Sequence, residues 1–167
     1  HRVQSGDRLI GVESSGFHSN GYSLLRKLFA DDLRQWAEKL LTPTHLYPKM
    51  VRNLLSQSLN LHAIAHVTGG GLDNLLRVLP EGLALELKPW PVPELFLEVK
   101  KRGKMEWSDL LLTLNCGIGL VLYVEANDFD KTMTLVKENG FRAYDMGVVV
   151  SGSEKKWSLD FNKLEAK

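Results

Sequence analysis

The sequence predicts an α+β fold in which helices pack against one mixed β-sheet. Strand-like and helix-like patterns alternate along the chain, and 167 residues suffice for one domain with its own core. The clearest part comes last and predicts strand, helix and strand, "GIGLVLYVE", "DFDKTMTLVKENG" and "RAYDMGVVVSG". We therefore expect residues 1–167 to form a single domain.

The first half of the chain is expected to contain two strands separated by helices. "DRLIGVES" has the pattern of a strand. Apolar residues then recur at spacings of three and four, as on one face of a helix or of two abutting helices, at Tyr22, Leu25, Phe29, Leu33, Trp36 and Leu40. Pro48 fits the first turn of the next helix, whose expected buried face carries Met50, Val51, Leu54 and Leu55. The mostly apolar "LHAIAHV" follows as a strand.

The second half continues the alternation. A glycine turn in "TGGGLDNLLRVLP" leads into a short helix, and "GLALELK" is the next strand. The prolines of "WPVPEL" stiffen the connection to a helix, "ELFLEVKKRG", which Gly103 is expected to end, and "EWSDLLLTL" predicts another helix. In the last helix we expect Asn127 or Asp128 as the N-cap and Gly140 just beyond the C-terminus.

Composition and charge argue against several classes of protein. The formal net charge of +1 provides no basic field for nucleic acid or a membrane surface. The longest apolar stretch, "LLLTLNCGIGLVLYV", is too short and too interrupted to span a bilayer, and no secretory signal pattern opens the sequence. Cys116 is the single cysteine, which excludes an internal disulfide and fits a reducing compartment. We therefore expect a cytoplasmic protein.

Two segments share a plan of strand, glycine-containing turn and helix, "LIGVESSGFHSNGYSLL" and "AIAHVTGGGLDNLL". The first amides of a helix have no partner within the helix and carry partial positive charge, so a phosphate or carboxylate binds well there. Ordinary chain reversal is the alternative for each turn. Three consecutive glycines favour function, because each one costs backbone entropy on folding. No Walker motif follows either turn.

Polar residues in and beside these turns are candidate site residues. His18 lies inside the first turn, and His66 directly precedes the second. Ser19 or Asn20 could instead cap the helix that follows. His62 and His66 lie about 13 Å apart if both are on one strand, so we expect no shared metal ion. "NCGIG" is a third candidate segment, because glycines at the start of a strand allow close backbone approach.

These residues also carry a family resemblance. In order along the chain, five segments resemble the signatures of aminoimidazole ribonucleotide synthetase, also called phosphoribosylformylglycinamidine cyclo-ligase: "SSGFHSNGYSLLRK", "LLTPTHLYPK", "HAIAHVTGGGLDNLLRVLPEGL", "WPVPELF" and "LNCGIGLVLYV". The resemblance extends to about Val150 and covers the C-terminal half of that enzyme. The family's N-terminal, ATP-binding half is absent from this chain. Two departures are "LTLNCGIG", where the family has Arg-Thr-Phe-Asn before its glycine pair, and "LDNLLRV", where it has Leu-Glu-Asn-Ile-Pro.

The resemblance implies a C-terminal domain of this α+β fold and an ATP-dependent, Mg²⁺-dependent ring closure in purine biosynthesis. In that family ATP converts the formyl oxygen of formylglycinamidine ribonucleotide to a phosphate ester, and an internal nitrogen then displaces phosphate. The resemblance also implies a cytoplasmic homodimer with its active site between the two halves of each chain. ATP and Mg²⁺ would bind mainly to the missing N-terminal half.

The resemblance further assigns site residues. It implies that His18 and Asn20 contact the reacting part of the substrate. It places substrate or phosphate contacts at Ser15, Ser19, Gly21, His66, Thr68, Gly69, Gly70, Gly71 and Asn115, and no metal ligand in this chain.

Two other functions stay open at this point. The chain could belong to a related ATP-using enzyme, similar to formylglycinamidine ribonucleotide synthetase or selenophosphate synthetase. It could also act as a non-catalytic phosphate-binding module when it is isolated from its other half.

Overall fold

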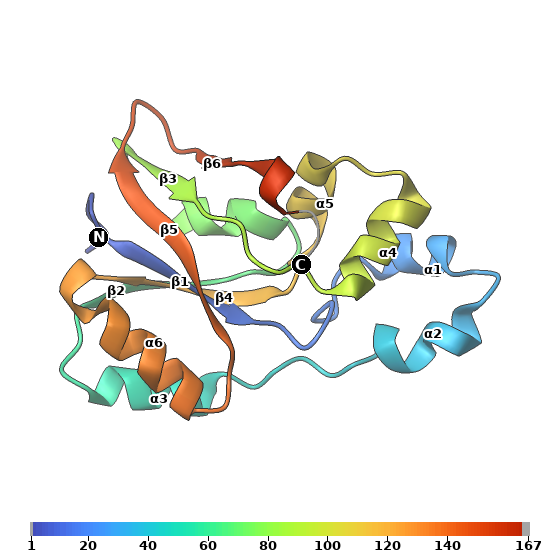
Figure 1. Cartoon of the computed structure of the whole chain (residues 1–167), viewed down its shortest axis with the longest axis horizontal. Coiled ribbons are helices and arrows are strands. Elements are labelled where there is room, and N and C mark those ends of the chain that lie inside the picture. Colours follow the sequence, from blue (N-terminus) through green and yellow to red (C-terminus); the bar gives the residue numbers. More distant parts are fainter. Residues whose placement is uncertain (1, 165–167) are drawn as a thin grey trace.

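A six-stranded sheet in the order β2-β4-β1-β5-β3-β6 organises the molecule (Figure 1). The computed structural model describes residues 2–164. Neighbouring strands are antiparallel except for β3 and β6, which are parallel, so the sheet is mixed as predicted. The strands are β1 (Arg8–Glu13), β2 (Leu61–His66), β3 (Leu83–Leu87), β4 (Ile118–Val124), β5 (Ala143–Ser151) and β6 (Trp157–Leu159).

Helices occupy nearly all the positions that the periodicity predicts. They are α1 (Tyr22–Leu28), α2 (Leu33–Leu40), α3 (Pro48–Ser56), α4 (Glu94–Gly103), α5 (Trp107–Thr113) and α6 (Phe129–Glu138). The 3₁₀ segments are η1 (Gly71–Val78), η2 (Ala126–Asp128) and η3 (Phe161–Lys163). The apolar series that begins at Tyr22 forms two helices, α1 and α2, and the segment after the three glycines is a 3₁₀ helix. No helix within residues 2–164 is long and apolar enough to cross a bilayer.

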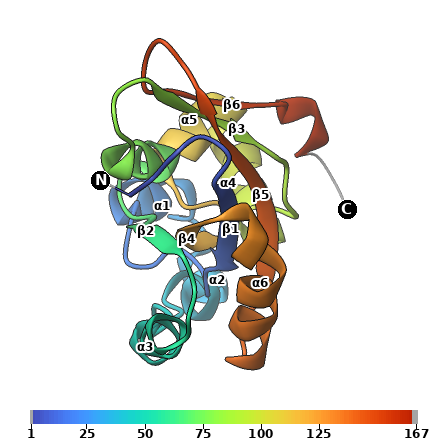
Figure 2. The ribbon, with the colours of Figure 1, turned by 90° about the vertical axis from the view of Figure 1, so that its left-hand side faces the viewer.

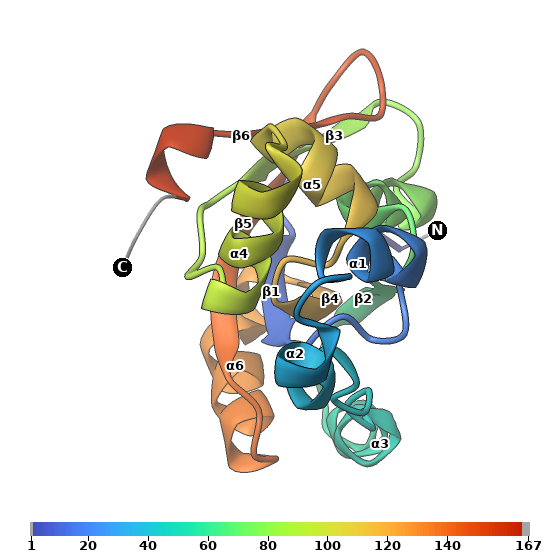
Figure 3. The ribbon, with the colours of Figure 1, turned by 90° about the vertical axis from the view of Figure 1, so that its right-hand side faces the viewer.

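The sheet separates two apolar cores. Side chains of alternating residues point to opposite faces of a strand, and in β4 the side chains of Val121 and Tyr123 join one core whereas those of Leu120 and Leu122 join the other. Helices α3 and α6 pack on the second core and against each other (Figure 2). Helices α1, α4 and α5 and segment η1 contribute to the first core, and Figure 3 shows them on the side away from α3 and α6. Each fully buried aliphatic side chain stabilises the fold by about 1.5–3 kcal/mol.

The final strand–helix–strand unit has the form that the sequence predicts. Strands β4 and β5 are both antiparallel to β1, which lies between them, so β4 and β5 run parallel to each other. Helix α6 makes the connection, and its buried Val136 packs into the second core. Gly140 follows this helix with φ +87°, in the left-handed conformation that glycine favours, so the expected helix end is confirmed.

Several local expectations were wrong. Gly103 is inside α4, and Lys104 with φ +47° takes the left-handed position that ends the helix. Asp128 is the N-cap residue of α6 as expected, although its carboxylate accepts the main-chain N–H of Asn60 at 2.7 Å and makes no capping bond to the helix. Leu55 is 63% exposed because the buried stripe of α3 contains only Met50 and Leu54. Strand β6 was not predicted, since it is three residues long.

Candidate functional site

The first candidate turn, Ser14 to Gly21, connects β1 to α1 and has a strained backbone. His18 and Ser19 both adopt left-handed conformations, with φ +50° and +61°. For non-glycine residues this costs on the order of 1–2 kcal/mol each, and such residues cluster at functional sites. The Asn20 side chain donates to the carbonyl of His18 at 2.8 Å. Gly21 is the N-cap of α1 and no side chain caps the helix, so Ser19 and Asn20 are not caps.

His18 is the buried centre of this turn. The residue is only 5% exposed, and its Nε2 accepts the main-chain N–H of Ser15 at 3.0 Å. Burial lowers the pKa of His18 to about 4, and the nearby His45 and His66 rings act in the same direction. His18 is therefore neutral near pH 7. The neutral ring is unsuited to binding phosphate through positive charge.

The second candidate turn, Thr68 to Gly71, connects β2 to η1. Its carbonyls are bonded by the buried Asn74 side chain, which donates to Gly71 O at 2.8 Å and to Thr68 O and Gly69 O at 3.4 Å. Gly69 and Gly70 are exposed, and within residues 2–164 no acceptor is bonded to the main-chain N–H of either one. These two amides are available to an anion.

The sheet brings the two turns together. β1 and β2 are both antiparallel to β4, so they run in the same direction and their carboxyl ends lie at one edge, where β4 begins. A Cβ atom built on Gly69 would lie 3.3 Å from Asn20 Oδ1, which shows that the side chain of one turn lies beside the backbone of the other. The site is therefore assembled from both turns.

Helix contributions to this site are smaller than the sequence suggested. Helix α1 contains only seven residues, and η1 is a 3₁₀ helix. A seven-residue helix and a 3₁₀ segment align fewer peptide dipoles than a long α-helix does. An anion bound here would therefore be held mainly by individual amides and side chains. The short helix expected after the second turn is a 3₁₀ helix.

Aromatic rings border the site on the side of α3. The ring centroid of His18 lies 6.1 Å from that of His45 and 6.0 Å from that of Tyr47, and the Tyr47 and His66 centroids are 6.4 Å apart. The Tyr47 hydroxyl donates to the carbonyl of Glu13 at 2.6 Å, at the end of β1. A cavity of about 580 Å³ opens beside these rings, lined by His45, Leu46, Tyr47, Pro48, Val51, Arg52, Ile64, His66 and Leu120.

A family model provides the decisive comparison. Residues 4–159 match the model described as AIR synthase related protein, C-terminal domain. The chain belongs to this family. The matched range includes both turns and every strand of the sheet, so the family fold and the α+β prediction agree.

Two curated relatives of this AIR synthase-related domain share a name. The chain is 46% identical over 169 residues to the phosphoribosylformylglycinamidine cyclo-ligase of Lysinibacillus sphaericus, covering 91% of this chain and 48% of that protein. It is 42% identical over 165 residues to the cyclo-ligase of Desulfitobacterium hafniense, covering 92% and 48%. The chain thus spans about half the length of the curated relatives it matches.

Solved structures share the fold of this AIR synthase-related domain at lower identity. The hydrogenase maturation protein HypE of E. coli superposes with a TM-score of 0.65 at 19% identity, covering 96% of this chain and 48% of that one. The thiamine-monophosphate kinase of Stenotrophomonas maltophilia K279a gives 0.60 at 18% identity, covering 94% and 51%. At these identities the likeness concerns the fold alone.

Two of the predicted contact residues have structural tasks in the domain. The Asn115 side chain is buried, accepts from Ser14 Oγ and Gly117 N, both at 2.9 Å, and donates to Gly16 O at 2.8 Å. It ties the first turn to the start of β4. The Gly71 amide donates to Thr68 O at 3.0 Å, and its Cα lies against the backbone of α5. Both therefore position the turns.

The remaining predicted residues border the two turns. Ser15 Oγ donates to Pro43 O at 2.6 Å, which links the turn to the segment before α3. Ser19 and His66 are exposed, and Thr68 and Gly21 are partly so. Gly21 has φ +75°, and a Cβ there would lie 2.5 Å from the Leu114 side chain.

Sequence reasoning missed His45 and Tyr47. His45 had no motif around it, and Tyr47 lies in a segment predicted only as the approach to a helix. Their one sequence signal was "THLYPK", within a segment that carried the family resemblance. Asp7 was also missed as a partner: it is 1% exposed, and its carboxylate bonds His62 Nδ1 at 2.8 Å. His62 thus pairs with a buried carboxylate at the far end of β2.

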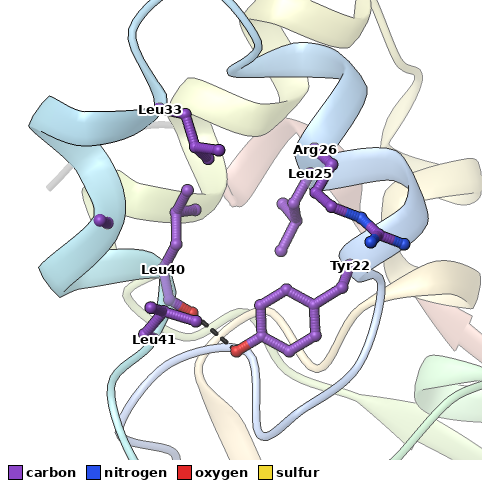
Figure 4. Close-up of a pocket in the computed structure, with 7 residues that line it drawn as sticks. Tyr22, Leu25, Arg26, Leu33, Leu40 and Leu41 are labelled. Atoms are coloured by element: carbon purple, nitrogen blue, oxygen red, sulfur yellow. Dashed lines mark hydrogen bonds between the residues drawn. The ribbon is translucent and has the colours of Figure 1, made fainter.

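Another cavity, of about 390 Å³, lies between α1 and α2 and is almost wholly apolar (Figure 4). The Tyr22 hydroxyl donates to Leu40 O at 2.8 Å on one side of it, and Arg26 is its only charged residue. Since it offers few groups to an anion, we do not place the candidate site there. Across residues 2–164 no group of three or more His, Cys, Asp or Glu side chains could hold a metal ion.

Proposed function

We propose that this chain is the C-terminal domain of a phosphoribosylformylglycinamidine cyclo-ligase, which closes formylglycinamidine ribonucleotide to aminoimidazole ribonucleotide with ATP. The observation that carries the proposal is the proximity of the Asn20 side chain to Gly69, which joins the two turns into one site with unbonded amides. Identity of 42–46% to proteins with that name supports it. The fold relatives are only 12–19% identical to the chain, so they support the alternative of a related ATP-using enzyme less.

The chemistry needs charge and position rather than a reactive side chain. ATP supplies the phosphoryl group that makes the formyl oxygen a leaving group. The Gly69 and Gly70 amides donate to a phosphoryl oxygen, and Asn20 fixes the substrate beside them. Holding the attacking nitrogen near the activated carbon accounts for a large share of rate enhancement in such reactions. A structure of HypE, one of the fold relatives, contains ATP, which supports nucleotide use by this fold.

The N-terminal half completes the site in this proposal. One sheet and its two cores account for residues 2–164, which supports treating the chain as a single domain. In this proposal the Mg²⁺ ligands belong mainly to the other half, as the family resemblance implies. The homodimer that the resemblance implies and the cytoplasmic location both stay predictions.

A chimera tests the proposal. This chain replaces the corresponding half of the Lysinibacillus sphaericus cyclo-ligase, and ADP release is measured with and without formylglycinamidine ribonucleotide. We expect ADP release that depends on that substrate. Asn20→Ala should lower kcat/KM about ten- to a hundredfold, the effect of losing a hydrogen bond to a charged group. Asn53→Ala is the matched control, because this exposed asparagine of α3 bonds Asn139 instead.

Only chimeras that are folded can decide between these outcomes. Cooperative thermal unfolding of each chimera establishes that it is folded. A folded chimera that releases no ADP with formylglycinamidine ribonucleotide contradicts the proposed function. Equal activity of the Asn20 and Asn53 variants removes Asn20 from the site.

A further inference from the structure

The two ring nitrogens of His18 have different environments. Nε2 accepts the main-chain N–H of Ser15 at 3.0 Å. A main-chain N–H can only donate, so Nε2 must carry a lone pair. The Ser15 hydroxyl lies 3.1 Å from Nε2, but it donates to Pro43 O at 2.6 Å and leaves the acceptor role of Nε2 unchanged. In the neutral ring the proton is therefore on Nδ1.

The surroundings keep the ring neutral. The titratable groups that face it are the imidazoles of His45 and His66 and the Tyr47 phenol, and burial raises the pKa of that phenol above its usual value. No carboxylate within residues 2–164 bonds the ring. A proton on His18 would add a positive charge at a place where no carboxylate of the described residues bonds the ring. Protonation of Nε2 would also break its bond with Ser15.

Nδ1 is left with a hydrogen and no acceptor. It is buried and, among the described residues, has no hydrogen-bond partner. A buried N–H without a partner costs about 1–3 kcal/mol, so such groups are rare and often functional. The ring packs closely against β4: a Cβ on Gly119 would overlap the Tyr47 hydroxyl and lie 2.7 Å from His18 Cε1. Only glycine at 119 allows this close packing.

We propose that His18 is a neutral hydrogen-bond donor, whose Nδ1–H binds an acceptor oxygen of the substrate, and that it is not the general base of the reaction. The acceptor oxygen belongs to a carbonyl or phosphoryl group, and its identity rests on the proposed function. The assignment of the His18 tautomer does not depend on that function. Because Nδ1 is covered in the unbound chain, binding includes a local adjustment of the turn. The strained conformations of His18 and Ser19 are suited to such an adjustment.

NMR tests the tautomer without reference to any activity. Multiple-bond ¹⁵N–¹H spectra of the ¹⁵N-histidine-labelled 167-residue chain distinguish Nδ1–H from Nε2–H, and His18→Gln identifies the resonances by their loss. We expect a protonated Nδ1 and an unprotonated Nε2 throughout pH 5.5 to 8. A protonated Nε2, or a titration with its midpoint between pH 6 and 7, overturns the proposal even if the chimera is a cyclo-ligase.

Two substitutions test the donor in the chimera. The amide nitrogen of asparagine lies near the position of Nδ1, whereas the glutamine amide reaches the position of Nε2 and can accept from Ser15. We expect His18→Gln to lower kcat about a hundredfold, as removal of one donor to a developing charge does. His18→Asn should lower it less than tenfold. Full activity of His18→Gln, or equal losses in two folded variants, overturns the proposal.

The acceptor is identified with two ligands. In the labelled chimera, the Nδ1 resonance is followed with inorganic phosphate and, separately, with formylglycinamidine ribonucleotide. A shift with phosphate indicates a phosphoryl acceptor, and a shift with the ribonucleotide alone indicates its formyl oxygen. No shift with either, in a chimera that turns over, overturns the proposal. A folded chimera without turnover contradicts the proposed function instead, and the tautomer is then judged by the first experiment.

Discussion

Replacement of Gly71 by alanine should destabilise the protein far more than the loss of one glycine usually does. Gly71 has φ +51°, and the added Cβ would overlap the carbonyl oxygen of Leu111 and lie 2.7 Å from its carbonyl carbon. The carbonyl carbon of Leu112 is 2.9 Å away. All three atoms are main-chain atoms of α5, so no side chain can rotate aside.

The magnitude has two parts. A left-handed conformation costs alanine about 1–2 kcal/mol relative to glycine. Relief of the overlap requires η1 to move away from α5 in a packed core, which costs about 1–3 kcal/mol. We expect a loss of about 3 kcal/mol in the free energy of unfolding, which is a large fraction of the usual total of about 5–15 kcal/mol.

The control is Gly82→Ala. Gly82 has φ +81° but no atom within 4 Å of its added Cβ, so this variant suffers only the conformational cost of about 1–2 kcal/mol. Urea unfolding followed by circular dichroism gives both values by linear extrapolation, with an unchanged m-value as the check on two-state behaviour. Equal losses in the two variants would refute the reasoning that close approach to α5 selects glycine at 71.

Three further predictions concern other parts of the molecule. Because the folded-state pKa of His18 is about 4 and its unfolded value 6.5, the unfolded chain binds more protons at intermediate pH. The free energy of unfolding is therefore highest above pH 6.5 and falls as the pH is lowered, by about 2 kcal/mol at pH 5. Urea titrations at pH 7 and pH 5 should show this loss in the wild type and not in His18→Gln. Asn115→Ala leaves the buried Gly16 O and Gly117 N and the partly buried Ser14 hydroxyl without this partner, and it should cost about 3 kcal/mol. A change below 1 kcal/mol would contradict its positioning role. Arg102 donates to Asp32 through two nitrogens, and its guanidinium lies over the Phe29 ring. Arg102→Lys should therefore lower the Tm measured by calorimetry at low salt. An unchanged Tm would show that this pairing does not stabilise the fold.

The candidate site was only partly accessible from the sequence. Local patterns identified both turns, because glycine and small polar residues between a strand and a helix are a local signal. The roles within the turns were not local. Gly71 looked identical to Gly69 and Gly70, yet only Gly71 lies against α5 and uses its own amide. Asn115 resembled a ligand residue, and three contacts made by distant segments give it a positioning role.

By itself, the sequence determined the α+β class, the order of the principal strands and helices, and the family. These follow from hydrophobic periodicity and from contiguous motifs, which depend on neighbours along the chain. The tertiary structure decided that β1 and β2 flank β4 and run in the same direction, which places the two turns beside each other. It also decided that His45 and Tyr47 stand next to His18, and that one nitrogen of His18 is bonded while the other is not. Strand pairing and the burial of individual atoms involve residues far apart in the chain, so hydrophobic periodicity along the sequence does not predict them.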